Sequence, residues 1–332
     1  MKHTETEKYF SQPSEVILGS PEDKSTCIRR FTDTGVFFRE FSLDSKKGGE
    51  PVEILQITDI HFNAFTEEDL KDEELALTKQ FRLWNAGGDS VRSVKKTIPL
   101  AKYFDKTIIT GDTLDFLSQG AMDMLHEHIW GVDPDILVAL GGHELVKQMQ
   151  TGERDKTPLS DRLAYLQKNW KHDIHYHSEI IGDKVLAVVL DNSQSKYLDG
   201  QYENLKADIE RARNDELVLL IFEHEPISTG KSEDEALKAI IRYDPEFANL
   251  YSGNAIGSTK RTADTATSKV YELITHSADV VRGIFCGHEH SAFYSEIKAF
   301  TNDGLRKDIP QVLLEGSPYN DQAGHILRIT IY

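Results

Sequence analysis

Residue types that bind metal ions follow five apolar segments of this 332-residue chain. Each apolar segment is typical of a buried strand, and the polar residues come at its carboxyl end. The five groups are Asp59-Ile60-His61, Gly111-Asp112, Gly142-His143-Glu144, His224, and Gly287-His288-Glu289-His290. Imidazole and carboxylate groups together suit ions such as Zn, Mn and Fe. The pattern therefore predicts a metal site to which several strand ends contribute.

The spacing within two of these groups favours a pair of ions. Asp59 and His61 are two residues apart, so on a strand they lean toward the same face. Asp112 has two carboxylate oxygens with which it can bridge two metals. Two ions about 3.5–4 Å apart hold an attacking hydroxide between them, clamp phosphate oxygens and lower the pKa of bound water. This chemistry is the hydrolysis of phosphate esters.

Each group on its own also has a plain structural explanation. An Asp-x-His pair can face solvent, a Gly-Asp pair often forms a turn, and the histidine before Glu225-Pro226 can be an ordinary surface residue. The argument rests on all five groups occurring in order, each directly after an apolar strand. That joint pattern favours a metal centre over five unrelated turns.

The elements between these groups alternate between strands and helices. Strands are expected at 52–62, 106–115, 135–144, 183–193, 216–226 and 280–290, with later strands within 292–300, 311–317 and 325–332. Helices are expected at 66–83, 90–104, 119–130, 145–150, 159–169, 200–214, 231–242 and 267–278. The order predicts α/β layers around buried sheets, and ligands in such sheets bind beyond the carboxyl ends of the strands.

The N-terminal region differs from the rest of the chain. Residues 1–14 are polar and are expected to be loose, whereas 15–43 contain short strand-like runs separated by turn residues. We therefore expect a small β appendage over residues 1–50 and one catalytic domain over residues 51–332. No linker rich in glycine and proline divides the catalytic part.

Composition limits the partners and the location. Lys and Arg number 38 against 55 Asp and Glu, which gives a formal charge of −17. This charge disfavours long nucleic acids and anionic membranes, so a small phosphoester or a nucleotide is the expected substrate. The sequence has no apolar run of the roughly 18 residues that a membrane span needs, and it begins without an apolar signal-peptide core, so the cytoplasm is expected. Nothing in the sequence indicates an oligomeric state.

Taken in order, the motifs resemble those of the calcineurin-like metallophosphoesterases, which read D-x-H, G-D-x-x-D, G-N-H-E, H and G-H-x-H. The matching segments are Asp59 to His61, Gly111 to Asp115, Gly141 to Glu144, His224, and Gly287 to His290, and the resemblance covers about residues 52–330. It implies an α/β (α+β) fold, a four-layer sandwich of two mixed β-sheets flanked by helices, here with a short N-terminal β appendage.

The resemblance also implies a role for each residue. Asp59, His61 and His290 would hold one ion, His224 and His288 would hold the second, and Asp112 would bridge them. The cofactors would be two divalent or trivalent ions, Mn, Fe or Zn. His143 would contact the phosphate and protonate the leaving alcohol, a general-acid role. Glu144 would orient His143, because the tautomer of a histidine is set by its other hydrogen bond.

Two positions depart from familiar patterns. Gly142 stands where the family has the Asn whose amide oxygen binds the second metal, so that ion would keep three protein ligands and solvent, with a lower affinity. Asp115 stands where purple acid phosphatases place a tyrosine ligand of iron, so the chain is more similar to bacterial members without that Tyr. By itself, Asp115 is typical of a loop or capping residue.

A polar stretch at 243–264 is predicted to be a loop, and loops at strand ends often carry substrate contacts. Asn254, Lys260 and Arg261 are the candidate substrate-binding residues in it, although a solvated charge pair explains Lys260 and Arg261 equally simply.

Two other functions stay open at this point. One is a metal-binding module that senses or scaffolds and turns over little substrate, which Gly142 favours. The other is a mononuclear hydrolase such as a zinc amidase, which would need a glutamate base near a three-ligand site, and Glu144 is the obvious candidate. Metal stoichiometry and the preference for phosphate esters over amides distinguish them.

Overall fold

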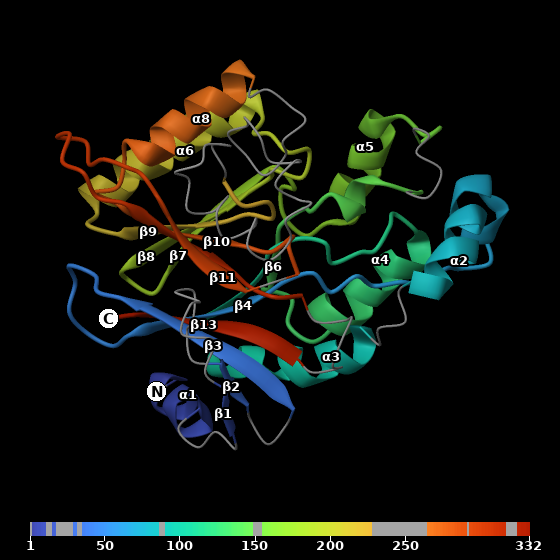
Figure 1. The fold of residues 1–332 in the computed structure, drawn as a ribbon, viewed down its shortest axis with the longest axis horizontal. Coiled ribbons are helices and arrows are strands. Elements are labelled where there is room, and N and C mark those ends of the chain that lie inside the picture. Colours follow the sequence, from blue (N-terminus) through green and yellow to red (C-terminus); the bar gives the residue numbers. More distant parts are fainter. Residues whose placement is uncertain are drawn as a thin grey trace.

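Two stacked β-sheets form the centre of the computed structural model, which describes residues 2–10, 15–17, 29–31, 35–85, 90–148, 155–227, 264–290, 292–316 and 324–332 (Figure 1). The first sheet has the strand order β1-β2-β3-β13-β4-β5-β6 and the second has the order β11-β12-β10-β9-β8-β7. Both sheets are mixed, because β13 runs parallel to β3 and antiparallel to β4, and β7 runs antiparallel to β8 while β8, β9 and β10 are parallel.

The strands of the first sheet are β1 (Glu15–Ile17), β2 (Arg29–Phe31), β3 (Val36–Leu43), β4 (Val52–Ile57), β5 (Lys106–Ile109), β6 (Leu137–Val138) and β13 (Gly324–Ile331). Those of the second are β7 (Tyr176–Ile181), β8 (Val185–Leu190), β9 (Val218–Phe222), β10 (Val281–Cys286), β11 (Phe293–Ile297) and β12 (Ile309–Leu313). The α-helices are α1 (Lys2–Phe10), α2 (Glu73–Asn85), α3 (Ser90–Thr97), α4 (Gln119–Leu125), α5 (Leu159–Asn169), α6 (Asp199–Asn214) and α8 (Thr265–Thr275). Short helical turns are η1 (Asp69–Lys71), η2 (Ile98–Tyr103), η3 (His126–Trp130) and η4 (His143–Leu145).

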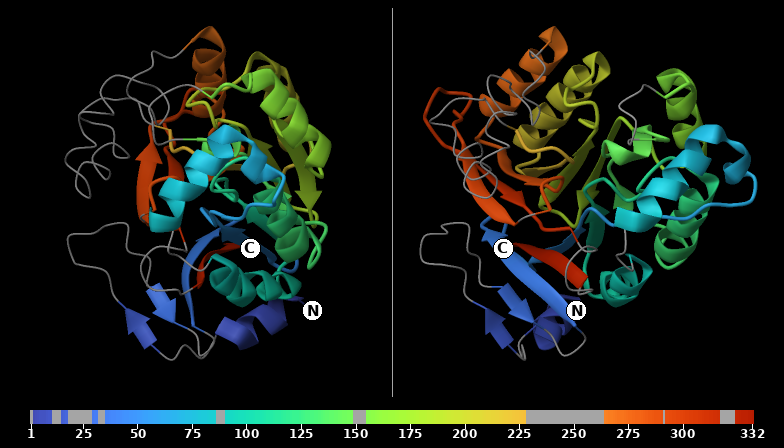
Figure 2. Two further views of the ribbon diagram at one scale, coloured as in Figure 1. Left: turned by 90° about the vertical axis from the view of Figure 1, so that its right-hand side faces the viewer. Right: turned by 45° about the vertical axis from the view of Figure 1, so that its right-hand side comes forward.

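Three hydrophobic layers hold the sandwich together. On β4, Ile54 belongs to the layer between the two sheets, and its neighbour Leu55 belongs to the layer under the helices of the first sheet. On β8, Val185 faces the other sheet, whereas Leu186 packs in the layer under α6 and α8. This alternation follows from the two-residue period of a strand, and buried strands therefore read as unbroken apolar runs. Figure 2 shows α6 and α8 outside one sheet and α1 and α3 outside the other, which confirms the predicted four-layer α/β fold.

The first residues are helical, where the sequence predicted a loose segment. Helix α1 packs Phe10 against the rings of Phe38 and Phe104, with centroids 4.5 and 5.9 Å away. Arg328 on β13 pairs with Glu7 of α1 and with the buried Glu53. These tertiary contacts explain why a polar sequence with little helical signal is ordered, since packing overrides local propensity. Strand β3 pairs with β13 along its whole length, and the domain division at residue 50 stays a prediction.

Other predicted elements differ in detail. The helix expected at 145–150 is absent from its described part, because η4 ends at Leu145 and residues 146–148 are not helical; residues 149–150 lie outside the described residues. Strand β7 lies in a stretch for which no strand was predicted, because its segment 176–181 mixes polar and apolar residues. The helix expected at 231–242 lies outside the described residues. No helix among the described residues is long and apolar enough to cross a membrane.

Candidate metal centre

The predicted ligands meet where four strands end. Asp59 and His61 follow β4, Asp112 follows β5, His224 follows β9, and the pair His288 and His290 follows β10. Backbone hydrogen bonds join the first two segments, from Asp59 N to Gly111 O at 3.1 Å and from His61 N to Asp112 O at 2.9 Å. The parallel pairing of β4 with β5 and of β9 with β10 brings these carboxyl ends side by side.

The backbone at these positions is strained. Among the described residues, seven non-glycine residues have a positive φ, and five of them are predicted ligands. These five are Asp59, His61, Asp112, His288 and His290, with φ between 48° and 76°. Left-handed backbone is unfavourable for residues with a side chain and concentrates at functional sites, where it aims side chains at a ligand. The strain therefore marks the same residues that the motifs selected.

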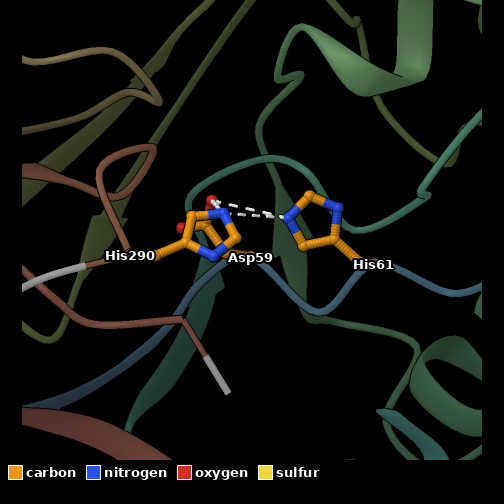
Figure 3. Close-up of side chains that lie close together, drawn as sticks. All are labelled: Asp59, His61 and His290. Atoms are coloured by element: carbon orange, nitrogen blue, oxygen red, sulfur yellow. Dashed lines mark hydrogen bonds and ion pairs between the residues drawn. The ribbon is translucent and has the colours of Figure 1, made fainter. Parts of the chain in front are cut away.

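Asp59, His61 and His290 form the first ligand group, shown in Figure 3. His61 Nε2 and His290 Nε2 are 3.1 Å apart, and Asp59 Oδ1 lies 3.3 Å from His290 Nε2 and 3.9 Å from His61 Nε2. Asp59 is fully buried, and its carboxylate accepts hydrogen bonds from Thr58 Oγ1 at 2.6 Å and from the His288 backbone N–H at 3.0 Å. These bonds fix the carboxylate so that Oδ1 faces both imidazoles.

Asp112, His224 and His288 form the second group. His224 Nε2 lies 3.1 Å from Asp112 Oδ2 and 3.2 Å from His288 Nδ1. The other ring nitrogen of His224 faces the Thr110 carbonyl oxygen at 2.8 Å. A hydrogen bond donated by Nδ1 orients the ring so that Nε2 faces the other two residues of the group, which is the usual arrangement around a metal-binding histidine.

One oxygen of Asp112 stands between the two groups. Asp112 Oδ2 lies 3.1 Å from His224 Nε2 in the second group and 4.0 Å from His61 Nε2 in the first. It also lies 3.9 Å from His143 Nε2. The second oxygen, Oδ1, accepts the backbone N–H of His143 at 3.0 Å. Asp112 is therefore the carboxylate whose position fits a bridge between two ions.

Asp115 orients His143, and the prediction that Glu144 does so is wrong. His143 Nδ1 lies 2.9 Å from the Asp115 backbone oxygen and 3.4 Å from Asp115 Oδ1. The same Oδ1 lies 3.3 Å from His61 Nδ1. Glu144 instead accepts backbone N–H groups from Thr113 at 2.5 Å and from Gly141 at 2.8 Å, so it ties two strand-end loops together. The only sequence signal for Asp115 was its place in the G-D-x-x-D spacing.

Burial and close charges together shift the pKa values of the ligands. Burial raises the pKa of Asp59, but the charge and hydrogen bond of His290 outweigh it and lower the pKa to about 2. The pKa of Asp112 is also lowered, because the charges of His224 and His143 overcome its burial. Conversely, burial lowers the pKa of His224, and the Asp112 carboxylate raises it well above the usual value. A cation that binds here displaces protons from histidine, so binding should weaken as pH falls.

His143 and Glu144, which follow β6, have different pKa values because their surroundings differ. Burial lowers the pKa of His143, but the carboxylates of Asp112 and Asp115 raise it to about 9. Burial and the negative charge of Asp112 raise the pKa of Glu144 to about 7. His143 therefore favours its protonated form, and its Nε2 is directed toward the space between the two ligand groups. A protonated imidazole at this position can give a proton to a bound molecule.

Glycines in the motifs permit the close approach of backbone to ligand. A Cβ atom on Gly141 would overlap Asp112 Oδ1, and one on Gly287 would overlap Thr58 Oγ1 and Asp59 Oδ2. Gly142 is different, because among the described residues beyond its chain neighbours a Cβ there comes within 4 Å of the Ser193 backbone oxygen alone, at 3.7 Å. Its backbone is right-handed, with φ −68° and ψ −32°, so a larger residue fits without strain. The glycine at 142 is therefore not required by the fold.

The donor atoms fit metal ions. In each group, one atom from each residue lies within 4.8 Å of the others. Ring nitrogens of different histidines face each other at 3.1 and 3.2 Å, an arrangement that is unfavourable for protonated imidazoles and suits a shared cation. Imidazole and carboxylate ligands are those that Zn, Mn and Fe accept. The histidine and aspartate clusters thus support divalent metal binding.

Some residues around the centre were not singled out from the sequence. Asn192, after β8, accepts the backbone N–H groups of His224 and Glu225 through Oδ1, at 3.2 and 3.0 Å. Asn63 donates to Asp115 Oδ2 at 2.8 Å. Both hold ligand-bearing segments in place, and no motif in the sequence distinguishes them. The predicted substrate residues Asn254, Lys260 and Arg261 lie outside the described residues.

Comparison with known proteins gives structural likenesses only. Neither a protein-family model nor a curated protein sequence matches this chain. A dimetal phosphatase from Danio rerio is similar at 12% identity and a TM-score of 0.43, over 80% of this chain and 87% of that one. A purple acid phosphatase from yellow lupin (Lupinus luteus) seeds is similar at 12% identity and a TM-score of 0.47, over 88% of this chain and 49% of that one.

A calcineurin-like phosphoesterase from Bacillus subtilis is similar at 13% identity and a TM-score of 0.35, over 80% of this chain and 81% of that one. Because each of these TM-scores is below 0.5, the likenesses carry no argument about activity. The function has to be argued from this chain's own residues.

Proposed function

We propose that this protein hydrolyses phosphomonoesters or phosphodiesters with two metal ions bound at the strand ends. Asp59, His61 and His290 hold one ion, His224 and His288 hold the other, and Asp112 bridges them. The bound ions supply Lewis acidity toward phosphate oxygens and a water of lowered pKa. The observation that carries the proposal is the position of one oxygen, Asp112 Oδ2. It lies 3.1 Å from His224 Nε2 in one ligand group and 4.0 Å from His61 Nε2 in the other.

His143 is the proposed general acid. Its Nε2 lies 3.9 Å from Asp112 Oδ2, so a phosphate held between the ligand groups comes within its reach. Asp115 holds the opposite nitrogen, Nδ1, through its backbone oxygen at 2.9 Å. With Nδ1 occupied by that bond, the proton at Nε2 is the one available to the leaving oxygen. Glu144 keeps the loop that carries His143 against the loop after β5.

The substrate class follows from charge and stays a proposal. A chain with a formal charge of −17 is poorly suited to long nucleic acids, so a small phosphoester or a nucleotide is the proposed substrate. The preference between mono- and diesters and the identity of the ions, Mn, Fe or Zn, are part of what the experiment measures. The cytoplasmic location likewise remains a proposal from the sequence.

Hydrolysis of p-nitrophenyl phosphate and bis-p-nitrophenyl phosphate by metal-stripped protein tests the proposal. Mn, Zn, Fe or Ni is added back singly, and His143→Ala is compared with His276→Ala, whose histidine is exposed directly after α8. We expect turnover to return with metal, to fall by about 10²- to 10⁴-fold in His143→Ala, and to be unchanged in His276→Ala. Turnover that is equal in the two variants would contradict the general-acid role.

One observation favours a second function, a metal-binding protein with little turnover. Position 142 offers no side chain to the second ion, although the space for one exists. If folded protein binds one ion tightly and cleaves neither ester with any metal, the sensing or scaffolding function gains. If it cleaves amides and not phosphate esters, the mononuclear amidase gains instead.

A further inference from the structure

A cavity of about 300 Å³ lies at the opposite end of the second sheet from the metal centre. It is lined by Val218 where β9 begins and by Val280 and Arg282 at the start of β10, whereas the predicted ligands follow the other ends of these strands. The rest of its wall comes from Lys46, the end of α6 at Arg213, and Asn302. The site is therefore separate from the metal centre and does not depend on the proposed hydrolase activity.

Positive charge gathers around this cavity. Within the described residues, Lys46 and Arg282 make no side-chain hydrogen bond or ion pair. Lys307 is half-buried beside them, and its pKa is lowered by burial and by the positive charges of Arg282 and Lys46. Like charges at close range repel each other. The chain has 17 more acidic than basic residues, so many carboxylates elsewhere could pair with these cations. An anion bound in the cavity would reduce the repulsion among these cations.

The acidic residues of the wall do not cancel this charge. Asp279 is engaged by Arg213, with Nε 2.6 Å from Oδ2 and Nη2 3.1 Å from Oδ1. The Arg213–Asp279 pair has no net charge, so neither residue adds to the net charge of the cavity wall. Glu216 is exposed and is the remaining acid of the lining. Two cations of the lining, Lys46 and Arg282, therefore face one carboxylate, and Lys307 adds a positive charge from outside the lining.

The backbone supports the placement of Arg282. The pairing of β10 with β9 shifts register there, since Val281 pairs with Leu219 and Gly283 with Leu220. Arg282 is thus the extra residue of a bulge, half-buried at the cavity wall. Bulges redirect a side chain out of the regular alternation and are common at sites of function. An arginine also presents a planar set of donors that matches the oxygens of a phosphate.

We propose that this cavity binds the phosphate group of a small anion, with Arg282 as the principal donor and with Lys46 and Lys307 as supporting charges. The volume holds inorganic phosphate or a small phosphomonoester. Both sources present the same dianionic oxygens, so the experiment separates them. Occupancy of the cavity neutralises repelling cations and is expected to stabilise the start of β9 and β10 together.

Phosphate binding to the full chain tests the proposal, by isothermal titration and by the melting temperature. The protein is studied both metal-loaded and after chelation, at constant ionic strength, with inorganic phosphate, glycerol phosphate or chloride as the added anion. Arg282→Gln and Lys46→Gln remove one charge each from the cavity. Arg211→Gln is the matched control, because Arg211 lies on α6 with an exposed side chain that is not part of the lining.

Phosphate should raise the melting temperature of the chelated protein more than chloride does. Affinity should fall about tenfold in Arg282→Gln and severalfold in Lys46→Gln, and should be unchanged in Arg211→Gln. Tighter binding of glycerol phosphate than of phosphate identifies an ester as the ligand, and the reverse identifies the free ion. If Arg282→Gln fails to fold, Lys46→Gln on its exposed loop decides the matter alone. Equal effects of phosphate and chloride, or equal affinities in cavity and control variants, would overturn the proposal.

Discussion

The two ligand groups of the candidate metal centre are built from the same kind of strand end, yet they offer a bound ion different numbers of side chains. The first group takes Asp59 and His61 from one turn after β4 and adds His290. The second has His224 and His288, and it shares Asp112 with the first. At position 142, the chain offers the second group a glycine with free space around it. The protein therefore has one well-surrounded half-site and one that is a side chain short.

The strands that position the centre and the set of metal ligands can therefore change independently of each other. Gly141 is needed because a Cβ there would overlap Asp112, whereas a Cβ at Gly142 would make an ordinary contact with Ser193 O, and the backbone angles there are ordinary. The fold would therefore tolerate a side chain at 142, and its absence bears on metal binding alone. Three protein ligands with an open position still suffice for a catalytic ion.

The largest expected effect comes from removing one histidine from each half-site. His61→Ala should lower turnover by about 10²- to 10³-fold at every metal concentration. The reason is that the first ion loses a ligand, and the bound phosphate thereby loses its contact with that ion. His224→Ala should lower turnover as strongly at low metal but recover in part at high metal, since its ion is already weakly held. Activity as a function of metal concentration measures both. Identical metal dependence in the two variants would remove the distinction between the half-sites.

The substitution Gly142→Asn should strengthen the second half-site. A Cβ at 142 lies an ordinary 3.7 Å from Ser193 O, and we expect the amide oxygen of the asparagine to supply the missing ligand. We expect the affinity for the second ion to rise by about ten- to a hundredfold, with the first unchanged. Metal titration followed by calorimetry measures this. Gly142→Ala is the control, because it adds the Cβ without a ligand atom and should change neither affinity.

Asp115→Asn should affect the first half-site and His143 and spare the second. One oxygen of Asp115 lies 3.3 Å from His61 Nδ1 and 3.4 Å from His143 Nδ1. Loss of its charge should weaken the first ion by about tenfold and lower kcat more than it raises KM. The backbone bond from His143 Nδ1 to Asp115 O remains, which limits the loss. A weakened second ion, with the first unchanged, would contradict this assignment.

Much of this arrangement could be predicted from the sequence, because strand ends and ligand residues are local patterns. The apolar runs at β4, β5, β9 and β10 located the ligands, and helix α5 begins and ends where predicted. What failed depends on distant contacts. Helix α1 is held by contacts with residues more than 25 positions away in the sequence: Phe10 packs against Phe38, and Glu7 pairs with Arg328. Asp115 acts through a hydrogen bond to His143, which follows another strand. The left-handed backbone of the ligands could not be located from the sequence either, because Asp and His adopt it more often than most residues but at only a few positions.

The smallest expected effect concerns β6, the two-residue edge strand that precedes Gly142 and His143. Both backbone groups of Val138 are satisfied by side chains: its N–H donates to His172 Nε2 at 3.1 Å, and its oxygen accepts Trp170 Nε1 at 2.9 Å. His172 must stay neutral to accept that bond. Burial, together with the positive charges of His177 and Lys106, lowers its pKa to about 4.

Because the folded pKa of His172 lies below the unfolded value of about 6.5, the unfolded chain binds more protons between these two values. The stability that neutral His172 contributes is therefore present above pH 6.5 and is lost as pH falls toward 4. Between pH 7 and pH 5 this loss should be about 1 to 2 kcal/mol, measured by urea unfolding. His172→Gln should abolish that part of the pH dependence, and the exposed control His276→Ala should retain it. Strand β6 leads into the segment that carries Gly142 and His143. If β6 supports only that half of the centre, acidification should weaken the binding of the second ion before that of the first.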